Sequence, residues 1–342
     1  MAGTHAETPE NPPQEYNVDP LLRLLRTTIM IPPMPSRAVS DASYTSSITS
    51  SVMNYKYENG RRYHSFHEGE YFLPNDETEQ DRLDLSHHVY RLLLGGELQL
   101  APIRDPKRIL DIGTGTGIWA IDFADQHPDA EVIGNLFPDD TRLPQKLPPN
   151  CRFEIDDFEQ PWEYSRPFDF IHGRELEGSI QDHDRLFQQA FNNLTPGGYF
   201  ELATIQITTT SDDGTHLKAE KFLRLCELCH EASRRFGKSL NTVTTWKEKM
   251  IQAGFEDVHE QKFKLPQSSW EKDPKLNELG RNHQVNVLES LGPYSYALFT
   301  RILGWSRSEI EVFLMGVRKE VKDLSNHLYT NAWFVYGRKP SA

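Results

Sequence analysis

The stretch from residue 108 to residue 120 constrains the fold more than any other part of this 342-residue chain. A short apolar run ends on Asp111, and the alternate glycines Gly113, Gly115 and Gly117 follow at once. A helix-like pattern comes after the last glycine. Glycines at a strand-to-helix turn let the backbone pass close to a ligand and leave helix N–H groups directed at it. The stretch therefore predicts a buried parallel strand, a ligand-binding turn and a helix.

Strands and helices alternate from residue 107 onward. We expect strands at 107–112, 130–135, 151–156, 168–172 and 198–205, and helices at 116–127 and 182–194, the second ended by the turn Thr195-Pro-Gly-Gly198. Farther on we expect helices at 216–236 and 243–253, a strand at 256–264, a largely helical block and a final strand at 328–337. This order predicts an α/β fold with a doubly wound, mostly parallel, seven-stranded Rossmann-like sheet. Ligands of such sheets bind at the carboxyl ends of the strands.

The chain divides into three regions by composition. Residues 1–45, rich in Pro, Glu, Asn and Thr, predict a flexible leader. Residues 46–105 predict an N-terminal cap that includes a helical segment, and residues 106–342 form the main domain. Within that domain we expect a helical lid, inserted at about 265–325 between the last two strands.

Charge and composition exclude several kinds of partner. The net charge of −13 argues against nucleic acid, which is bound through clustered Lys and Arg. No apolar stretch is long enough to span a bilayer, so we expect no membrane partner. Three cysteines fit a reducing compartment better than a disulfide framework. We expect a cytoplasmic protein, with the nucleus as the alternative.

The glycine turn admits two kinds of cofactor. Residues 115–120, Gly-Thr-Gly-Ile-Trp-Ala, satisfy the dinucleotide fingerprint, which alone is a weak indication. The turn also resembles the first motif of class I S-adenosylmethionine (SAM) methyltransferases. The alternation that starts at Asp111 favours SAM, because the acid can bind the ammonium group of the cofactor. Thr114 and the three glycines are then cofactor-binding candidates, and a turn that serves only packing is the third interpretation.

Two further segments are cofactor-binding candidates. The acid expected after the second strand, where it would hold ribose hydroxyls, is missing, and Asn135 stands there as a weaker hydrogen-bonding group. Asp156, Asp157 and Phe158 end the third strand, where a side chain can accept from the adenine amino group and an apolar neighbour can stack on the ring. An exposed acidic turn explains those three residues almost as well.

The exit of the fourth strand carries His172, Arg174 and Glu175, which we expect to face the methionine end of the cofactor and the acceptor. Arg174 ranks above His172, because a histidine in an apolar strand is more often a packed residue. The segment Cys226-Glu-Leu-Cys229-His230 matches a haem-attachment pattern. It lies on a helical stripe that also contains Leu217, Phe222, Leu225, Ala232 and Phe236, so we predict buried core cysteines and no metal site.

Ahead of the sheet, the segment from Tyr57 to His64 is dense in aromatics, Arg and His. It could close over the cofactor, or it could be a surface segment pinned by its aromatic side chains.

Taken together, these segments resemble the fungal LaeA-like group of SAM-dependent methyltransferases. The matching pieces are Tyr57-x-Glu-Asn-Gly-Arg61-x-Tyr63-His64, Pro74-Asn-Asp-Glu77, Arg82-Leu-Asp-Leu85, Ile109 to Trp119, Pro149 to Asp157, Phe168 to His172, Gly178-Ser-Ile180 and Pro196-Gly-Gly198. The resemblance implies a class I fold, SAM as cofactor, cofactor contacts from Tyr57 and Arg61, and a role in fungal secondary metabolism. Some members of the group are nuclear regulators with velvet-domain partners, and others methylate small molecules. The group typically has an Asp after the second strand, which this chain lacks.

The sequence thus predicts a SAM-dependent methyltransferase that acts on a small natural product. We place His64 and Tyr63 on the lid side of the acceptor and Arg174 and Glu175 across from them. Lid aromatics either favour an apolar acceptor or, as an equal alternative, form the core of the lid: Trp270, Tyr294, Tyr296, Phe299 and Trp305. Three alternatives stay open: a methyltransferase fold repurposed as a non-methylating cyclase or pericyclase, a LaeA-type regulator with a velvet-type partner, and an NAD-dependent enzyme.

Overall fold

The computed structural model describes residues 56–63, 71–136 and 146–341, all within one compact unit, Ser47–Ala342. The expected leader and His64 lie outside the described residues. The region boundaries at residues 45 and 105 stay predictions.

The centre of the fold is a seven-stranded sheet with the order β5-β4-β3-β6-β7-β9-β8. Its strands are β3 (Arg108–Ile112), β4 (Glu131–Leu136), β5 (Cys151–Ile155), β6 (Phe168–Arg174), β7 (Leu194–Ile205), β8 (Glu256–Pro266) and β9 (Tyr329–Arg338). β9 pairs antiparallel with both of its neighbours, and the other pairings are parallel. The predicted seven-stranded, mostly parallel sheet is therefore confirmed. The strand order reverses between β3 and β6, so the ligand site of such a sheet is expected at their carboxyl ends.

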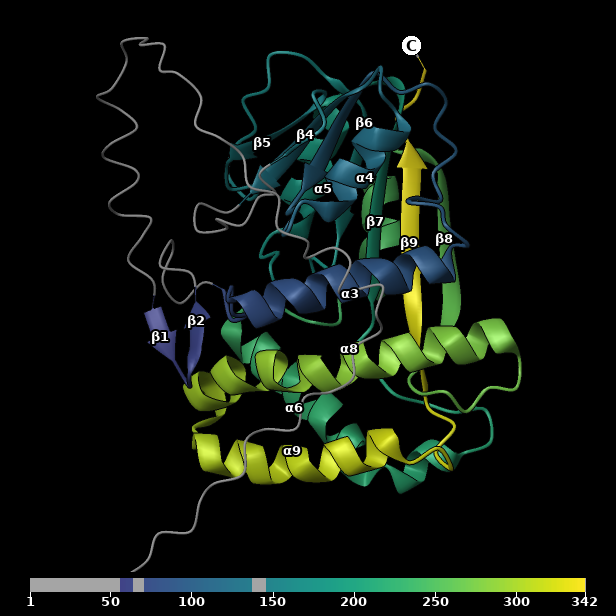
Figure 1. Ribbon diagram of the computed structural model, residues 1–342. Helices are drawn as coiled ribbons and strands as arrows, with labels where there is room; N and C mark the ends of the chain where they lie inside the picture. Colours follow the sequence, from purple (N-terminus) through teal and green to yellow (C-terminus); the bar gives the residue numbers. More distant parts are fainter. Residues whose placement is uncertain (1–55, 64–70, 137–145, 342) are drawn as a thin grey trace, which may run out of the picture. The chain divides into compact units, whose positions relative to one another are not determined.

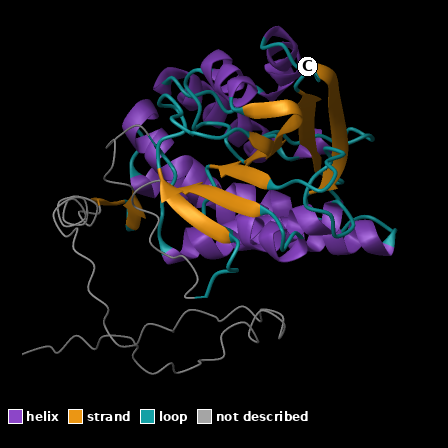
Figure 2. Ribbon diagram, turned by 90° about the horizontal axis from the view of Figure 1, so that it is seen from above, coloured by secondary structure: helices purple, strands orange, loops and turns teal. Residues whose placement is uncertain are grey.

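Helices pack on both faces of the sheet (Figure 2). α4 (Ile118–Gln126) covers Ile109 and Val132 on one face. α5 (His183–Asn192) and α7 (Trp246–Gln252) cover the other face. Every residue of β3 is buried, and Ile109, Leu110 and Ile112 supply the apolar side chains that a strand with helices on both faces needs.

A separate helical layer lies across the end of the sheet where β7 ends and β9 begins (Figure 1). It contains α3 (Glu77–Leu93), α6 (Glu220–Phe236), α8 (Pro274–Leu298), the π-helical turn η3 (Phe299–Leu303) and α9 (Arg307–Lys322). The last three follow one another in the chain between β8 and β9, and together they form the helical insert, residues 274–322. Ser306 and Glu309 form a capping box at the start of α9.

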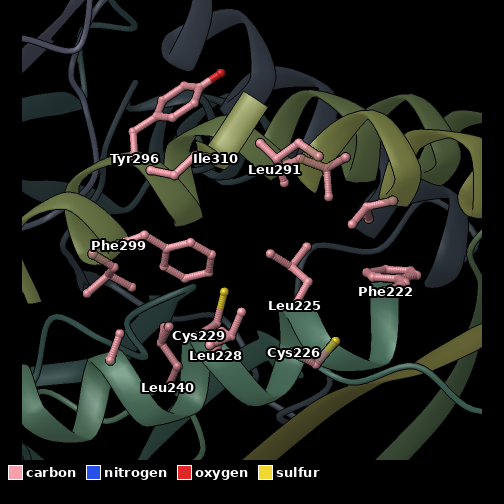
Figure 3. Packing of buried hydrophobic residues seen from close by; sticks show 14 of the residues in the cluster. Phe222, Leu225, Cys226, Leu228, Cys229, Leu240, Leu291, Tyr296, Phe299 and Ile310 are labelled. Atoms are coloured by element: carbon pink, nitrogen blue, oxygen red, sulfur yellow. The ribbon is translucent and has the colours of Figure 1, made fainter. Parts of the chain in front are cut away.

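The core of this layer is built from facing apolar side chains of α6 and the insert (Figure 3). Cys226 and Cys229 are buried there with Leu225, which confirms that they are core residues. Leu217 differs from the expected stripe: it lies in the short 3₁₀ helix η1 (Thr215–Lys218) before α6 and is 65% exposed. No helix in the described part of the chain is long and apolar enough to cross a membrane.

Two local features differ from the sequence expectation. The turn at residues 195–198 lies inside β7, where the pairing jumps from Phe168–Leu194 to Phe170–Tyr199, and α5 ends earlier, at Asn192. Gly197 adopts a φ of +81° in this irregularity, which acts as an enlarged bulge rather than as a strand boundary.

The second difference is a hairpin of two short strands, β1 (Lys56–Glu58) and β2 (Arg61–Tyr63). It is fastened to the helical layer, because Nη2 of Arg301 lies 2.7 Å from Oε2 of Glu58. Asn59 adds a hydrogen bond from its Nδ2 to Thr300 Oγ1 at 3.3 Å.

Candidate functional site

The glycine turn after β3 has the strained backbone that its sequence predicts. Gly113, Gly115 and Gly117 have φ values of +61°, +58° and +78°, a region that side chains with a Cβ rarely adopt. A Cβ on Gly113 would lie 2.5 Å from Leu176 Cδ2, so Leu176 would have to move to admit any other residue there. Gly117 precedes α4 with no side-chain cap, which leaves the first N–H groups of that helix available to a ligand.

Asp111 at the end of β3 is buried and held from two sides. Nδ1 of His172, on the adjacent strand β6, lies 2.7 Å from Oδ1 of Asp111. The hydroxyl of Thr114 donates to Oδ2 of the same carboxylate. His172 also stacks on Trp119, with ring centroids 3.7 Å apart. Burial lowers the pKa of His172, although Asp111 opposes the shift.

Arg174 ends β6 next to this group. Its Nη2 lies 3.0 Å from Nδ1 of His87, and its guanidinium lies 4.7 Å from the ring centroid of Tyr90. Nε2 of His87 in turn lies 3.0 Å from Oδ2 of Asp122, so this nitrogen donates and Nδ1 accepts from Arg174. Among the described residues, no carboxylate lies within 4.0 Å of Arg174, and burial lowers its pKa. It is a partly buried cation without an acidic partner.

Glu175 follows with a φ of +58°, an unusual conformation for a residue that is not glycine. Its Oε1 accepts hydrogen bonds from the hydroxyl of Tyr90 and from the backbone N–H of Ile205, the latter at 2.9 Å. Burial raises the pKa of the Glu175 carboxyl. Strained residues of this kind concentrate at functional sites.

Glu175 also lines a cavity of about 90 Å³ at the ends of β6 and β7. The other walls come from α3, α6 and α8, and they include Arg82, Ser86, Leu225, His283 and Tyr294. Arg82 is not free there, since its Nη2 lies 2.6 Å from Oε1 of Glu79 and its Nη1 donates to Asn286 at 3.2 Å. We call this space the helical-layer cavity.

The structure places Asn135 away from Asp111. Asp111 is paired with Gly134, so the next residue of β4, Asn135, points to the opposite face of the sheet. Its side chain is 1% exposed, its Oδ1 has no partner among the described residues, and its amide affects the pKa of Tyr164. The ribose role of Asn135 stays a prediction.

Phe158 is buried beneath the turn, 3.5 Å from the point that a Cβ on Gly113 would occupy. Asp157 closes its own turn by accepting from the backbone N–H of Glu159 at 2.9 Å. Burial raises the pKa of Asp156, and no positively charged side chain among the described residues contributes to that shift.

The described N-terminal candidates lie in the hairpin, and the residues that they contact lie outside the glycine turn. Tyr57 is 73% exposed, and Arg61 is bound to Asp76 through two nitrogens, with Nη2 at 2.7 Å from Oδ1. Tyr63 is buried under Arg301, and burial raises the pKa of its hydroxyl to about 12. His64 lies outside the described residues.

Helix α3 supplies site residues that the sequence did not single out. Asp84 accepts from the hydroxyl of Thr116 in the glycine turn at 2.7 Å, and His87 and Tyr90 contact Arg174. These three are spaced at intervals of three residues and therefore lie on one face of the helix. That spacing is the sequence feature that could have indicated them.

A sheet that reverses its order beside a glycine-rich turn, with an acid at the end of the first central strand, is the arrangement expected of class I methyltransferases, and the comparisons separate them from dinucleotide-binding enzymes, which share most of it. A family model described as "Methyltransferase domain" matches residues 85–260. The chain is 42% identical to "Methyltransferase pytC" of Aspergillus terreus. The alignment of 306 residues covers 88% of this chain and 93% of that protein.

Two other relatives extend the comparison. "Probable methyltransferase tdiE" of Emericella nidulans is 34% identical, over 78% of this chain and 83% of that protein. "Secondary metabolism regulator LAE1" of Cochliobolus heterostrophus is also 34% identical, over 83% of this chain and 94% of that protein. The chain belongs to the class I, SAM-dependent methyltransferase family, in the group that contains pytC and the LaeA regulators.

Proposed function

We propose that this protein transfers a methyl group from SAM to a small, largely apolar molecule of fungal secondary metabolism. The observation that carries the proposal is Arg174, a cation without an acidic partner among the described residues, on the strand next to Asp111. A carboxylate and a guanidinium that has no acidic partner among the described residues, on adjacent strands, match the ammonium and the carboxylate of an amino-acid group such as the methionine part of SAM.

The residues present fit the cofactor. Both oxygens of Asp111 are in use, yet each keeps a lone pair that an ammonium group can share. The fork of Arg174 suits a carboxylate, since guanidinium binds that group through two parallel hydrogen bonds. The N–H groups at the start of α4 and the small residues of the turn leave the backbone open to the rest of the ligand.

When bound, SAM supplies the methyl group, and the protein supplies alignment and exclusion of water. Holding two reactants in line can contribute roughly 7–11 kcal/mol in favourable cases. We assign Glu175 to the proton of a hydroxyl acceptor, because its carboxylate lines the helical-layer cavity and is fixed by Tyr90 and the backbone of Ile205. An acceptor that carries no proton at the reacting oxygen would need no base.

The degree of similarity favours an enzyme that methylates small molecules over a regulator. Identity is 42% to pytC, a methyltransferase by name, and 34% to LAE1, a regulator by name. The net charge of −13 also favours neither nucleic acid nor an acidic partner.

Calorimetric titration with SAM tests the proposal. We expect binding to the unaltered protein and its loss in Gly115→Arg, because the side chain would fill the turn beside Leu83. The matched control is Gly214→Arg, which has a similar φ of +79° and open space around it. No binding at millimolar SAM would refute the proposal.

The product decides between methyl transfer and rearrangement. Extracts of the producing fungus with and without the protein are compared by mass spectrometry. We expect a product heavier by one methylene unit, with the label from methyl-deuterated SAM. A product of unchanged mass would indicate a cyclase or pericyclase instead.

A further inference from the structure

The helical-layer cavity holds three buried polar atoms that no protein group satisfies. Nδ1 and Nε2 of His283, on α8, and Oγ of Ser86, on α3, have no hydrogen-bond partner in the described part of the chain. Both residues line this cavity. Buried side-chain polar atoms normally have a partner, so three in one small space call for a ligand or ordered water.

His283 is a buried histidine, and neither of its ring nitrogens has a partner among the described residues. The residue is 2% exposed, and burial lowers its pKa to about 3. The imidazole is therefore neutral at physiological pH. A neutral imidazole offers one N–H donor and one lone pair, which suits a hydroxyl or a carbonyl oxygen better than an ion.

The remaining walls are mostly apolar. Phe222, Leu225 and Cys226 of α6 face Leu291 of α8 across this part of the layer, and Val287 adds to the same lining (Figure 3). Of the charged residues that line the cavity, Arg82 is neutralised by its ion pair with Glu79. The space thus accepts a largely apolar body and offers it two side chains with unsatisfied polar atoms, His283 and, on α3, Ser86.

The opposite wall connects the cavity to the cofactor turn. Glu175 lines the cavity and accepts from Tyr90, whose ring lies against Arg174, and Arg174 is on the strand that pairs with Asp111. A molecule in the cavity therefore lies between the anchor His283 and the residues that we assign to the reaction.

We propose that the helical-layer cavity binds the reacting end of the acceptor, a neutral and largely apolar group with a hydroxyl or carbonyl oxygen that pairs with His283. The biological role of this site rests on the proposed function, but the test of binding described below does not. The volume of about 90 Å³ has room for about three waters or for one end of a larger molecule. His283 is a specificity-determining anchor, and the proton transfer stays with Glu175.

Phenol and toluene are suitable probes, because they share a ring and differ in the hydroxyl group. We expect the unaltered full-length protein to bind phenol at least tenfold more tightly than toluene in calorimetric titrations. In protein labelled with ¹⁵N at histidine, phenol should shift the ring nitrogen signals of His283 and toluene should not.

Two variants test the anchor. His283→Leu should remove the preference for phenol and keep or improve the binding of toluene. His283→Gln should retain part of the preference, since an amide also donates and accepts. The control is His88→Leu, the same substitution at an exposed position of α3, which should bind both probes as the unaltered protein does.

Equal affinity for the two probes, or a preference for phenol that survives in His283→Leu, would overturn the inference. If the Leu variant does not fold, the ¹⁵N shifts of the unaltered protein decide. SAM affinity is measured on the same samples and should change less than twofold in His283→Leu. A protein that binds SAM but ignores phenol contradicts this inference alone, and one that binds phenol but not SAM contradicts the proposed function alone.

Discussion

His172 and Asp111 meet across two adjacent strands, with Nδ1 of the imidazole 2.7 Å from Oδ1 of the carboxylate. The acid of the glycine turn is thereby fixed by β6, and β6 also carries Arg174 and leads into Glu175. Cofactor and acceptor residues are thus set on one pair of strands, which makes their relative positions insensitive to loop motion.

Replacing His172 with Phe tests this coupling. The phenyl ring can still stack on Trp119, but Oδ1 of Asp111 loses its partner, and an unpaired buried acceptor costs about 1–3 kcal/mol. We expect that loss in the free energy of unfolding, measured by urea titration, and weaker SAM binding. In a double-mutant cycle with Asp111→Asn the two losses should not add. Additive losses would mean that the contact contributes nothing.

Arg174→Met tests the carboxylate site. We expect the affinity for S-adenosylhomocysteine to fall at least tenfold, about 1.4 kcal/mol. The affinity for 5′-methylthioadenosine, which lacks the amino-acid group, should not change. Arg224→Met is the control, because Arg224 is exposed and paired with Glu227 on α6. Equal losses for both ligands would exclude a carboxylate contact.

Glu175→Gln tests the proton acceptor. Burial raises the pKa of Glu175, so the ionised form should be lost, and kcat/KM should fall, at a higher pH than an ordinary Glu would give. The variant should lose about 10²-fold or more in kcat and its acidic limb. Glu177→Gln is the control, since that carboxylate binds the backbone of Val243. A variant with unchanged kcat would assign the acceptor to a group that carries no proton.

Alanine at two glycines of the turn should have unequal effects. Gly113→Ala would bring a Cβ to 2.5 Å from Leu176, and the core beneath cannot yield easily. Gly115→Ala meets only Leu83 at 3.6 Å, so its cost is the strain of a positive φ, about 1 kcal/mol. Thermal unfolding should therefore show a clearly lower Tm for Gly113→Ala. Equal Tm values would show that the turn tolerates the Cβ at both positions.

Glu201 should make stability depend on pH. Its carboxylate is fully buried in β7 and accepts from the backbone of Leu100 and Ala101, and burial raises its pKa to about 7. The folded state then holds a proton that the unfolded state releases near pH 4.5. The stabilisation is complete below that pH and is lost as the pH rises through about 7.

Glu201→Gln should remove this part of the pH dependence, up to about 3 kcal/mol between pH 4.5 and pH 8. Urea titrations of both proteins at several pH values give the comparison. Parallel curves for the two proteins would show that Glu201 stays ionised in the fold.

The sheet could be predicted because the local sequence of its strands indicates strand structure. β3 carries an apolar run and is followed by alternate glycines, and the helical insert has a capping box at Ser306 and a regular stripe from Ile310 onward. The hairpin β1–β2 was not predicted, since strands of three residues are too short to show an alternation. Its position depends on the contact between Glu58 and Arg301, which are far apart in the chain.

The sequence predicted which residues belong to the candidate site better than it predicted which of them contact one another. Asp111, Arg174 and Glu175 were chosen from their places at strand ends, and the structure brings them to adjacent strands. The pairing of Asp111 with His172 depends on the register between β3 and β6, which no local pattern contains. The same is true of His283, whose importance follows from a cavity that several stretches of chain, far apart in the sequence, enclose.

The helical insert enters the chain between β8 and β9 and leaves the glycine turn and the five neighbouring parallel strands untouched. It supplies one wall of the helical-layer cavity and none of the turn. Changes of sequence within residues 274–322 can therefore alter which molecule is accepted while the methyl donor stays the same. A lineage of such enzymes could diversify its chemistry by exchanging a single continuous cassette, and grafting this insert from a relative is the corresponding route for engineering.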